Sequence, residues 1–310
     1  MQARLEKILS HHAAMVLDPL RTLPLARAIE KIVKPGDVVL DIGTGIGLLS
    51  FIAARAGAKQ VFAIDANSEA VEVAKSYAQQ FGLADRITFF EGLSFDLELE
   101  KRVDVIICET IGSLGFDENI LATLSDAKKR LLKKGGRIIP DKMELWGVPV
   151  TLPLLCKEGQ GEVDLNSDLL TWSNVADFDF AQTIGKIRSR KPLKSPLAKM
   201  ISPKSFLAKP QKLSTIDFQA SFKSFLHTKT SFRFLREGVI SGMGLWPVVR
   251  WAKGLTTDCS PGKPHTHWGQ GVLDLPKQKI ITGEKKTFEL IIEPHPEDPM
   301  RNTEILWKIK

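Results

Sequence analysis

Strand-like and helix-like segments alternate from about residue 34 to residue 140, and this alternation constrains the fold more than any other feature. It is the pattern of a parallel sheet with helices on both faces, and it predicts an α/β domain with a parallel-rich sheet over residues 34–140. The predicted strands include 37–42, 60–65 and 103–108, and the predicted helices are 48–58, 68–82 and 121–134.

The pattern changes after Pro140. Short β-rich runs separated by turn residues follow, with little helical periodicity. Such spacing predicts antiparallel strands in a sandwich or barrel over residues 141–310. The segment 164–190 is the exception, and we expect it to be partly helical.

Two helices are predicted ahead of the alternating region, at about 2–16 and 19–33. Pro19 suits the first position of the second helix, because proline lacks only a hydrogen-bond donor that is unpaired there in any case. We therefore treat residues 1–33 as a separate N-terminal unit.

Composition excludes several classes of protein. The chain has 310 residues and three widely spaced cysteines, an odd number that indicates no disulfide framework. Its N-terminal residues do not read as a signal peptide, and no uninterrupted apolar run is long enough to span a membrane. We expect a cytoplasmic protein that does not associate with a membrane.

The net charge of +7 is unevenly distributed. Residues 1–140 carry 18 basic and 18 acidic side chains, whereas residues 141–310 carry 25 and 18. Residues 180–216 hold nine Lys or Arg and no acid. Such a run is either a solvated face or a surface for an anionic partner.

The sequence VLDIGTGIG (39–47) lies where a predicted strand gives way to a helix. Gly43, Gly45 and Gly47 allow a tight turn and a close approach of the backbone to a ligand. Asp65 ends the next strand, where a carboxylate can accept hydrogen bonds from both hydroxyls of a ribose, and Asp41 is expected to point into the same crevice. The alternative is a tight turn beside an exposed acidic residue, with no ligand-binding role.

These residues resemble the class I S-adenosylmethionine-dependent methyltransferases, whose cofactor-binding domain is Rossmann-like. A nicotinamide-dinucleotide enzyme is the competing interpretation, but its fingerprint is GxGxxG and the chain has GxGxG. An amino-methylating DNA enzyme would carry an (Asp/Asn/Ser)-Pro-Pro-aromatic tetrad after the fourth strand. The chain has CETI there.

Two glutamates, Glu109 and Glu118, lie on one glycine-containing stretch after the strand 103–108. Two carboxylates suit a flat cation such as a guanidinium, which has five donors in a fixed fork. They would offset the cost of bringing that cation beside a sulfonium. They would also leave electron density on the nitrogen that attacks the methyl carbon, which must be placed in line.

At this point the chain resembles the protein arginine methyltransferases specifically. In that family two glutamates nine residues apart grip the substrate arginine, and Glu109 and Glu118 match them. A Thr-His-Trp loop in the C-terminal β-barrel walls the acceptor pocket, and its counterparts are Thr266, His267 and Trp268.

The resemblance extends to the N-terminal helices, which cap the cofactor in the family. The pattern His-x-x-Met-x-x-Asp-x-x-Arg is present as His12, Met15, Asp18 and Arg21. It implies that Arg21 pairs with the cofactor's carboxylate and that Asp18 meets His267, with a supporting or proton-relaying role. Asp96 matches the acidic position near the adenine amine.

The family resemblance predicts S-adenosylmethionine as cofactor, a protein arginine as acceptor and a homodimer with 164–190 as its dimerisation arm. Two features depart from the family. No aromatic residue lies in the ten positions before His12, and Thr110-Ile111 replace the usual Trp-Met after the first glutamate. The alternatives are a methyltransferase of a small guanidino or amino compound or of a nucleic-acid-associated target, or a non-catalytic cofactor-binding scaffold.

A metal site is not expected. Cys259, His265 and His267 are spaced as Cys-x5-His-x-His, which is not a usual zinc pattern.

Overall fold

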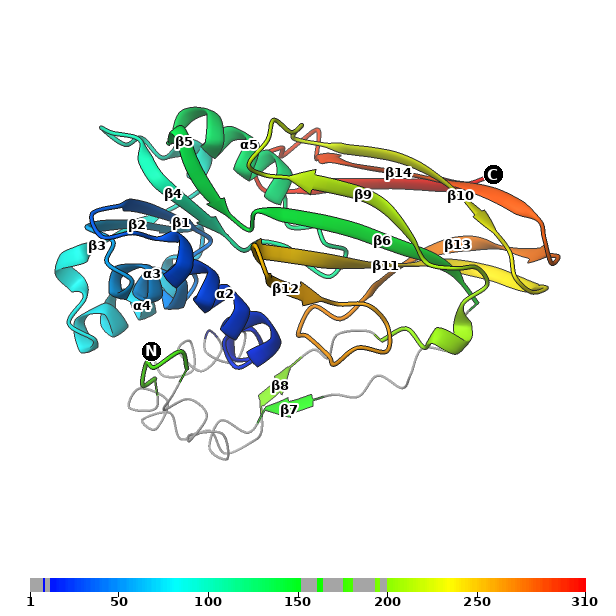
Figure 1. Cartoon of the computed structure of the whole chain (residues 1–310), viewed down its shortest axis with the longest axis horizontal. Helices are drawn as coiled ribbons and strands as arrows, with labels where there is room; N and C mark the ends of the chain where they lie inside the picture. The colour runs from blue at the N-terminus through cyan, green and yellow to red at the C-terminus, as the bar shows by residue number, and fades with distance from the viewer. Residues whose placement is uncertain (1–7, 9–11, 152–160, 164–174, 181–192, 196–199) are drawn as a thin grey trace.

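The first half of the chain forms a five-stranded parallel sheet, as predicted (Figure 1). The computed structural model describes all residues except 1–7, 9–11, 152–160, 164–174, 181–192 and 196–199. The strand order is β3-β2-β1-β4-β5, and every neighbouring pair is parallel. The strands are β1 (Val38–Ile42), β2 (Gln60–Asp65), β3 (Ile87–Glu91), β4 (Val103–Cys108) and β5 (Leu132–Ile139).

The helices around this sheet are α2 (Pro19–Ile32), α3 (Leu48–Arg55), α4 (Ser68–Gln80) and α5 (Ile120–Arg130), with short 3-10 turns at Ala84–Arg86 and Ser94–Asp96. Pro19 occupies the start of α2, as predicted, and Asp18 caps it. The prediction for α5 was wrong at its end, because the helix stops at Arg130 and Leu132 already pairs with Val103 in the sheet. Leu132 is buried there, so sheet packing overrides the helical propensity of LLKK.

The second half forms antiparallel sheets, which confirms the predicted strand type. One sheet has the order β12-β11-β6-β9, with β13 also paired to β11, and the other has the order β10-β14-β15. Their closure into a barrel stays a prediction. The strands are β6 (Lys142–Val150), β9 (Gln211–Asp217), β10 (Leu226–Arg233), β11 (Gly238–Ala252), β12 (Leu255–Asp258), β13 (Gly271–Ile280), β14 (Lys285–Pro294) and β15 (Thr303–Ile309); a separate pair is β7 (Gly161–Val163) with β8 (Leu193–Ser195), and a 3-10 turn spans Pro203–Ser205.

The two halves share one hydrophobic core, so the sheets are fixed relative to each other. Helix α2 packs against β12, and the hydroxyl of Thr257 donates to the carbonyl of Leu20 at 2.8 Å. At the junction between β5 and β6, the guanidinium of Arg250 donates to Asp141 at 2.6 Å. The assignment of separate roles to 1–33, 34–140 and 141–310 stays a prediction.

Most of the predicted dimerisation arm, 164–190, lies outside the described residues. The described part, 175–180, packs two phenylalanines onto the C-terminal end of α4. The ring centroid of Phe178 lies 5.0 Å from that of Phe81, and the ring centroid of Phe180 lies 4.6 Å from that of Tyr77. None of the described helices is both long and apolar enough to cross a membrane.

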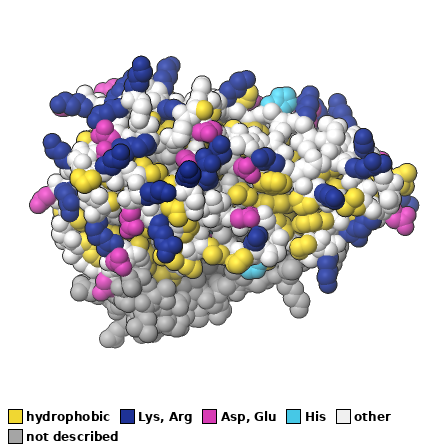
Figure 2. All heavy atoms as spheres, viewed as in Figure 1, with side chains coloured by type: hydrophobic (Ala, Val, Ile, Leu, Met, Phe, Trp, Pro, Cys, Tyr) yellow, Lys and Arg dark blue, Asp and Glu magenta, His cyan; other side chains and the backbone are white. Residues whose placement is uncertain are grey.

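The basic run 180–216 is also only partly described. Of its three described basic side chains, Lys212 donates to Glu144 at 2.9 Å, while Lys204 and Lys209 are exposed. Lys and Arg side chains lie over both the parallel-sheet half and the strand-rich half of the face in Figure 2. A binding surface for an anionic partner therefore stays a prediction.

Candidate active site

A cavity of about 500 Å³ opens at the carboxyl ends of the parallel strands. Its walls include Ile42 and Asp65, the last residues of β1 and β2, and Gly92 and Glu109, the first residues after β3 and β4. The strand order reverses direction between β1 and β4, and ligands of open α/β sheets bind at such a switch point. The volume suits a small-molecule ligand.

The glycine-rich turn forms one wall of this cavity. Gly43, Gly45 and Gly47 all have positive φ, at 75°, 54° and 93°. Gly43 and Gly45 line the cavity, whereas Gly47, also expected to bind the cofactor, does not and instead precedes α3 and packs against Phe51. A β-carbon at position 45 would lie 3.2 Å from the imidazole of His12, so the backbone is open only because no side chain is present. Asp65 accepts from the Gly45 amide at 2.8 Å, which fixes the turn against the next strand.

Asp41 lies beneath the turn and does not line the cavity, in contrast to the expected orientation. It is fully buried and accepts hydrogen bonds from the hydroxyls of Thr44 at 2.8 Å and Ser50 at 2.7 Å. Burial outweighs these bonds and raises the pKa of Asp41 to about 6. Asp41 thus organises the turn from below.

The N-terminal residues close the cavity from the other side. His12, Met15 and Arg21 all line it, as the resemblance implied. The guanidinium of Arg21, however, donates to Glu109 through Nε at 2.6 Å and through a second nitrogen, and it also donates to the Met15 carbonyl at 3.2 Å. Arg21 was expected to pair with the cofactor's carboxylate, but its partner in the structure is the first of the two glutamates.

The two glutamates line the same cavity but differ in environment. Glu109 has 4% of its side chain exposed and is held by Arg21. Glu118 is exposed. The cavity wall removes part of its hydration and the charges of Glu109 and Asp117 oppose its ionisation, so the pKa of Glu118 is raised to about 7.

The connection between the glutamates is tightly built. Gly112 has a φ of 70°, and a β-carbon there would clash with the carboxylate of Asp117. The same carboxylate accepts from the Leu114 amide at 2.9 Å. Thr110 lines the cavity and Ile111 is fully buried, so the two residues that replace Trp-Met contribute to the wall and to the core respectively.

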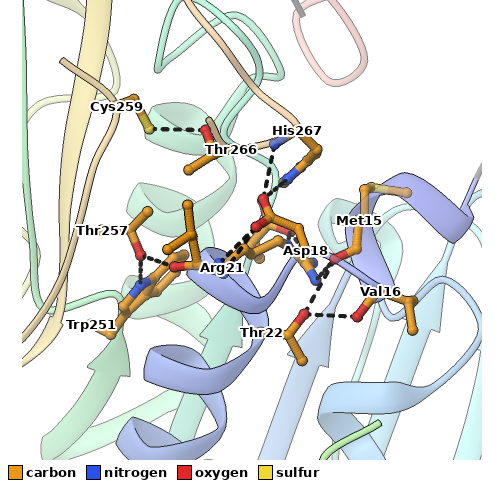
Figure 3. Close-up of polar contacts among 12 residues, drawn as sticks. Met15, Val16, Asp18, Arg21, Thr22, Trp251, Thr257, Cys259, Thr266 and His267 are labelled. Atoms are coloured by element: carbon orange, nitrogen blue, oxygen red, sulfur yellow. Dashed lines mark hydrogen bonds and ion pairs between the residues drawn. The ribbon is translucent and has the colours of Figure 1, made fainter. Parts of the chain in front are cut away.

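Asp18 and His267 meet at the junction of α2 with the C-terminal half, as the resemblance implied (Figure 3). One oxygen of Asp18 accepts from the His267 amide at 2.8 Å and contacts its Nδ1 at 3.0 Å, and the other accepts from the Leu20 amide at 2.9 Å. Burial opposes ionisation of Asp18, but the contacts with His267 outweigh it and lower the pKa of Asp18. Neither residue lines the cavity.

The other residues of the Thr-His-Trp loop are buried away from the cavity. The Thr266 hydroxyl contacts the thiol of Cys259 at 3.4 Å (Figure 3). Trp268 is 4% exposed and stacks on Trp251 with ring centroids 6.1 Å apart. Trp268 was expected to wall the acceptor pocket, and the structure does not bring it to the cavity.

Asp96 is exposed and does not line the cavity, unlike its neighbours Ser94 and Phe95. Asn119, Met300 and Arg301 also line the cavity and were not predicted from the sequence. No sequence pattern connects position 119 with positions nearly two hundred residues later. Asn119 adopts the left-handed αL conformation, with φ of 61°, although it is not a glycine. Asparagine tolerates this conformation better than most residues, so its presence is the one local indication that position 119 is special.

The described part of the chain contains no group of three or more His, Cys, Asp or Glu side chains arranged to hold a metal ion. Burial raises the pKa values of Cys108 and Cys259 to about 12, so neither thiol ionises readily as a metal ligand would.

Two family models match the chain. One is described as ribosomal protein L11 methyltransferase (PrmA) and matches residues 22–141. The other is described as the arginine methyltransferase oligomerization subdomain and matches residues 159–308.

Curated relatives match over most of the chain. Protein arginine N-methyltransferase 1 of Dictyostelium discoideum is 30% identical over 286 residues, which cover 88% of this chain and 80% of that protein. An arginine N(omega)-methyltransferase of Streptomyces achromogenes subsp. streptozoticus is 28% identical and covers 90% of this chain and 75% of its own length.

The fold also matches solved structures. The Trypanosoma brucei PRMT1 enzyme-prozyme heterotetrameric complex with AdoHcy superimposes with a TM-score of 0.70, at 22% identity, over 96% of this chain and 97% of that one. The parallel sheet, the cavity at the carboxyl ends of its strands and the similarity to the Dictyostelium protein all indicate the same family. The chain belongs to the protein arginine methyltransferase family.

Proposed function

We propose that this protein transfers a methyl group from S-adenosylmethionine to a guanidino nitrogen of a protein arginine. The observation that carries the proposal is that Glu109 and Glu118 line the same cavity as the glycine-rich turn and Asp65. A single cavity therefore contains two carboxylates that can bind a cation and a glycine-rich backbone turn that can bind a nucleoside. The relatives that are named arginine methyltransferases support the same reaction.

The cavity fits S-adenosylmethionine. Gly43 and Gly45 bring the backbone to the cavity wall at positions where β-carbons would crowd Thr110 and His12. Asp65 lines the same wall, and its carboxylate, oriented by the amides of Gly45 and Asn67, would accept from ribose hydroxyls. Met15 and Phe95 offer apolar surface. When bound, the cofactor supplies a methyl group on a positively charged sulfur.

The two glutamates would perform different tasks on the acceptor. Glu109 is fixed by Arg21 through one oxygen, Oε2, which leaves Oε1 to accept from a guanidinium. Glu118 stands at the exposed side, and a carboxylate with a pKa near neutrality is suited both to bind the cation and to accept the proton that the methylated nitrogen loses. In the transfer, a nitrogen–carbon bond forms as the sulfur–carbon bond breaks.

Asp18 and His267 would help to position other residues of the site and would not touch the substrate, because neither lines the cavity. Asp18 holds the start of α2, where Arg21 lies two residues beyond Pro19, and it ties that start to His267. The pair would set the place of Arg21 and, through it, of Glu109. A shift of about 1 Å in such a group is enough to lower the rate of a reaction that depends on alignment.

Two further expectations belong to this proposal. The match of 159–308 to an arginine methyltransferase oligomerization subdomain supports a homodimer. The buried free thiols of Cys108 and Cys259 suit a reducing compartment such as the cytoplasm.

Free arginine is the second candidate acceptor, because one relative is named an arginine N(omega)-methyltransferase. The glutamate pair would grip the same guanidinium in either case. The choice between the acceptors depends on what surrounds the cavity mouth.

Site variants test the proposal directly. Glu109→Gln and Glu118→Gln should each lower methylation of an arginine peptide by at least about tenfold while S-adenosylmethionine binds with nearly normal affinity. The matched control is Glu144→Gln, since Glu144 lies in β6, outside the cavity. Unchanged turnover in both cavity variants would refute the assignment.

A further inference from the structure

The connection between β14 and β15 reaches the cavity, although it belongs to the other half of the chain. Every other cavity-lining residue among those described lies at or before Thr123, and this connection adds Met300 and Arg301. Figure 1 shows the turn between β14 and β15 close to α5. The C-terminal half thus supplies its own part of the cavity mouth.

Asn119 holds this connection in place. Its side-chain amide donates to the carbonyls of Pro299 at 3.0 Å and Met300 at 3.1 Å, and the residue is 5% exposed. Asparagine is among the best residues for capping a helix N-terminus, yet this side chain makes no capping bond to α5. The side chain is committed to the turn instead, one residue after Glu118.

The turn is also ordered internally. Asp298 accepts from the amides of Arg301 at 3.3 Å and Asn302 at 3.0 Å, and its carboxylate accepts from the Asn302 side chain at 3.2 Å. The His295 amide donates to the Asn302 carbonyl at 2.9 Å. The backbone of Arg301 is therefore fixed beside the cavity.

The guanidinium of Arg301 has no ion pair or side-chain hydrogen bond with the rest of the described structure, and the residue is exposed. Arg21, the other arginine of the cavity, is committed to Glu109. No hydrogen bond or ion pair among the described residues joins Arg301 to Glu109 or Glu118, whereas Arg21 is bonded to Glu109. Arg301 is thus a cation of the cavity wall that is not committed to the glutamate pair.

An exposed guanidinium fork beside a cavity binds a carboxylate. We propose that Arg301 selects acceptors that carry a carboxylate next to the guanidinium that is methylated. This inference rests on the proposed function and extends it to the class of acceptor. Without Arg301, Glu118 and Asp65 would repel such a carboxylate.

The charge of the whole chain agrees with this class of acceptor. The net charge is +7 and the surplus lies in residues 141–310, the half that carries Arg301. A positive field accelerates the encounter with acidic acceptors and slows it with basic tails. Long-range attraction and the local contact therefore favour the same acceptors.

Two sources of carboxylate are distinguished by the choice of acceptor. The first arm uses three peptides that each contain one arginine and differ only in its two neighbours, which are glutamate, alanine or lysine. The second arm compares free arginine with argininamide, which lacks the α-carboxylate. The measured quantity in both arms is kcat/KM, together with the KM for S-adenosylmethionine.

The wild-type protein should prefer the glutamate peptide to the alanine peptide by about five- to tenfold, or free arginine to argininamide by a similar factor. Arg301→Gln should remove that preference through the KM for the acceptor. Arg301→Lys should restore part of it, and Arg301→Glu should reverse it toward the lysine peptide. Arg233→Gln is the matched control, because Arg233 is exposed on β10 and outside the cavity.

Asn119→Asp supplies a second test, since a carboxylate cannot donate to the two carbonyls that hold the turn. It should weaken the preference without altering Arg301 itself. A preference in the peptide arm alone assigns the carboxylate to a neighbouring acidic residue, and a preference in the arginine arm alone assigns it to the free amino acid.

Methylation that is indifferent to neighbouring charge, or an Arg301→Gln defect confined to the KM for S-adenosylmethionine, would overturn the inference and leave the proposed function intact. Failure to methylate any arginine acceptor would instead overturn the proposed function, and the inference with it.

Discussion

The pairing of Arg21 with Glu109 can be measured by a double-mutant cycle. The side chains are only 8% and 4% exposed, and two guanidinium nitrogens of Arg21 donate to one oxygen of Glu109. Arg21→Met would leave a buried carboxylate without its cation, and Glu109→Gln would leave a buried guanidinium without its anion. Each change should lower the free energy of unfolding by about 3–5 kcal/mol.

The double variant removes both charges, so it should lose much less than the sum of the single losses. We expect a coupling energy of about 2–3 kcal/mol. Urea unfolding followed by the fluorescence of the six tryptophans measures all four proteins. The control cycle uses Lys212 and Glu144, which are 45% and 26% exposed and should couple by less than about 1 kcal/mol.

Additive losses at Arg21 and Glu109, within about 0.5 kcal/mol, would refute the reasoning. They would mean that Arg21 is not the group that fixes the first glutamate. Glu109 would then be free to present both carboxylate oxygens to the acceptor.

Three further predictions follow from the ionisation and hydrogen bonding of the site. With a Glu118 pKa of about 7, kcat/KM should rise about tenfold from pH 6 to pH 8 as the carboxylate ionises. Glu118→Gln should flatten that rise, and an unchanged rise in the variant would assign the titration to another group. Asp41 has a folded pKa of about 6 against an ordinary 3.8, so the folded state binds its proton more tightly and stability should fall by about 3 kcal/mol as the pH rises from about 4 to above 6. Urea unfolding at pH 4.5 and 7.5 should detect about 2 kcal/mol of this fall, because the rest occurs below pH 4.5. Asp41→Asn should reduce the difference in stability between the two pH values, and an equal difference in both proteins would contradict the assignment. Asp18→Asn keeps a helix cap but weakens the contact with His267, so it should cost about 1–3 kcal/mol in thermal unfolding, with Asp18→Ala about 1 kcal/mol worse; equal losses would show that the cap alone matters.

Much of the fold was predictable because its signals are local. The run from residue 37 to residue 65 encodes strand, glycine turn, helix and strand within one continuous segment, and the parallel sheet follows from it. The end of α5 was not predictable in this way. LLKK reads as helix locally, and only the pairing of Leu132 with Val103 makes it strand.

Site residues could be predicted where they belong to a sequence motif. They could not be predicted where residues far apart in the sequence come into contact only in the folded protein. Glu109 and Glu118 were found by their spacing on one loop. The donation from Asn119 to Pro299 and Met300 joins residues about 180 positions apart, and only the docking of the two halves creates it. Trp268 shows the reverse case, since its motif is present but its ring packs on Trp251 instead of lining the cavity.

The identity of the methylated atom tests the central claim most directly. The purified protein is incubated with isotopically labelled S-adenosylmethionine and a cell extract, and the labelled products are digested and sequenced by tandem mass spectrometry. The account predicts the label on the guanidino nitrogens of arginine, and its loss in Glu109→Gln and Glu118→Gln. Label only on lysine, on nucleic acid or on a compound without a guanidinium would contradict it.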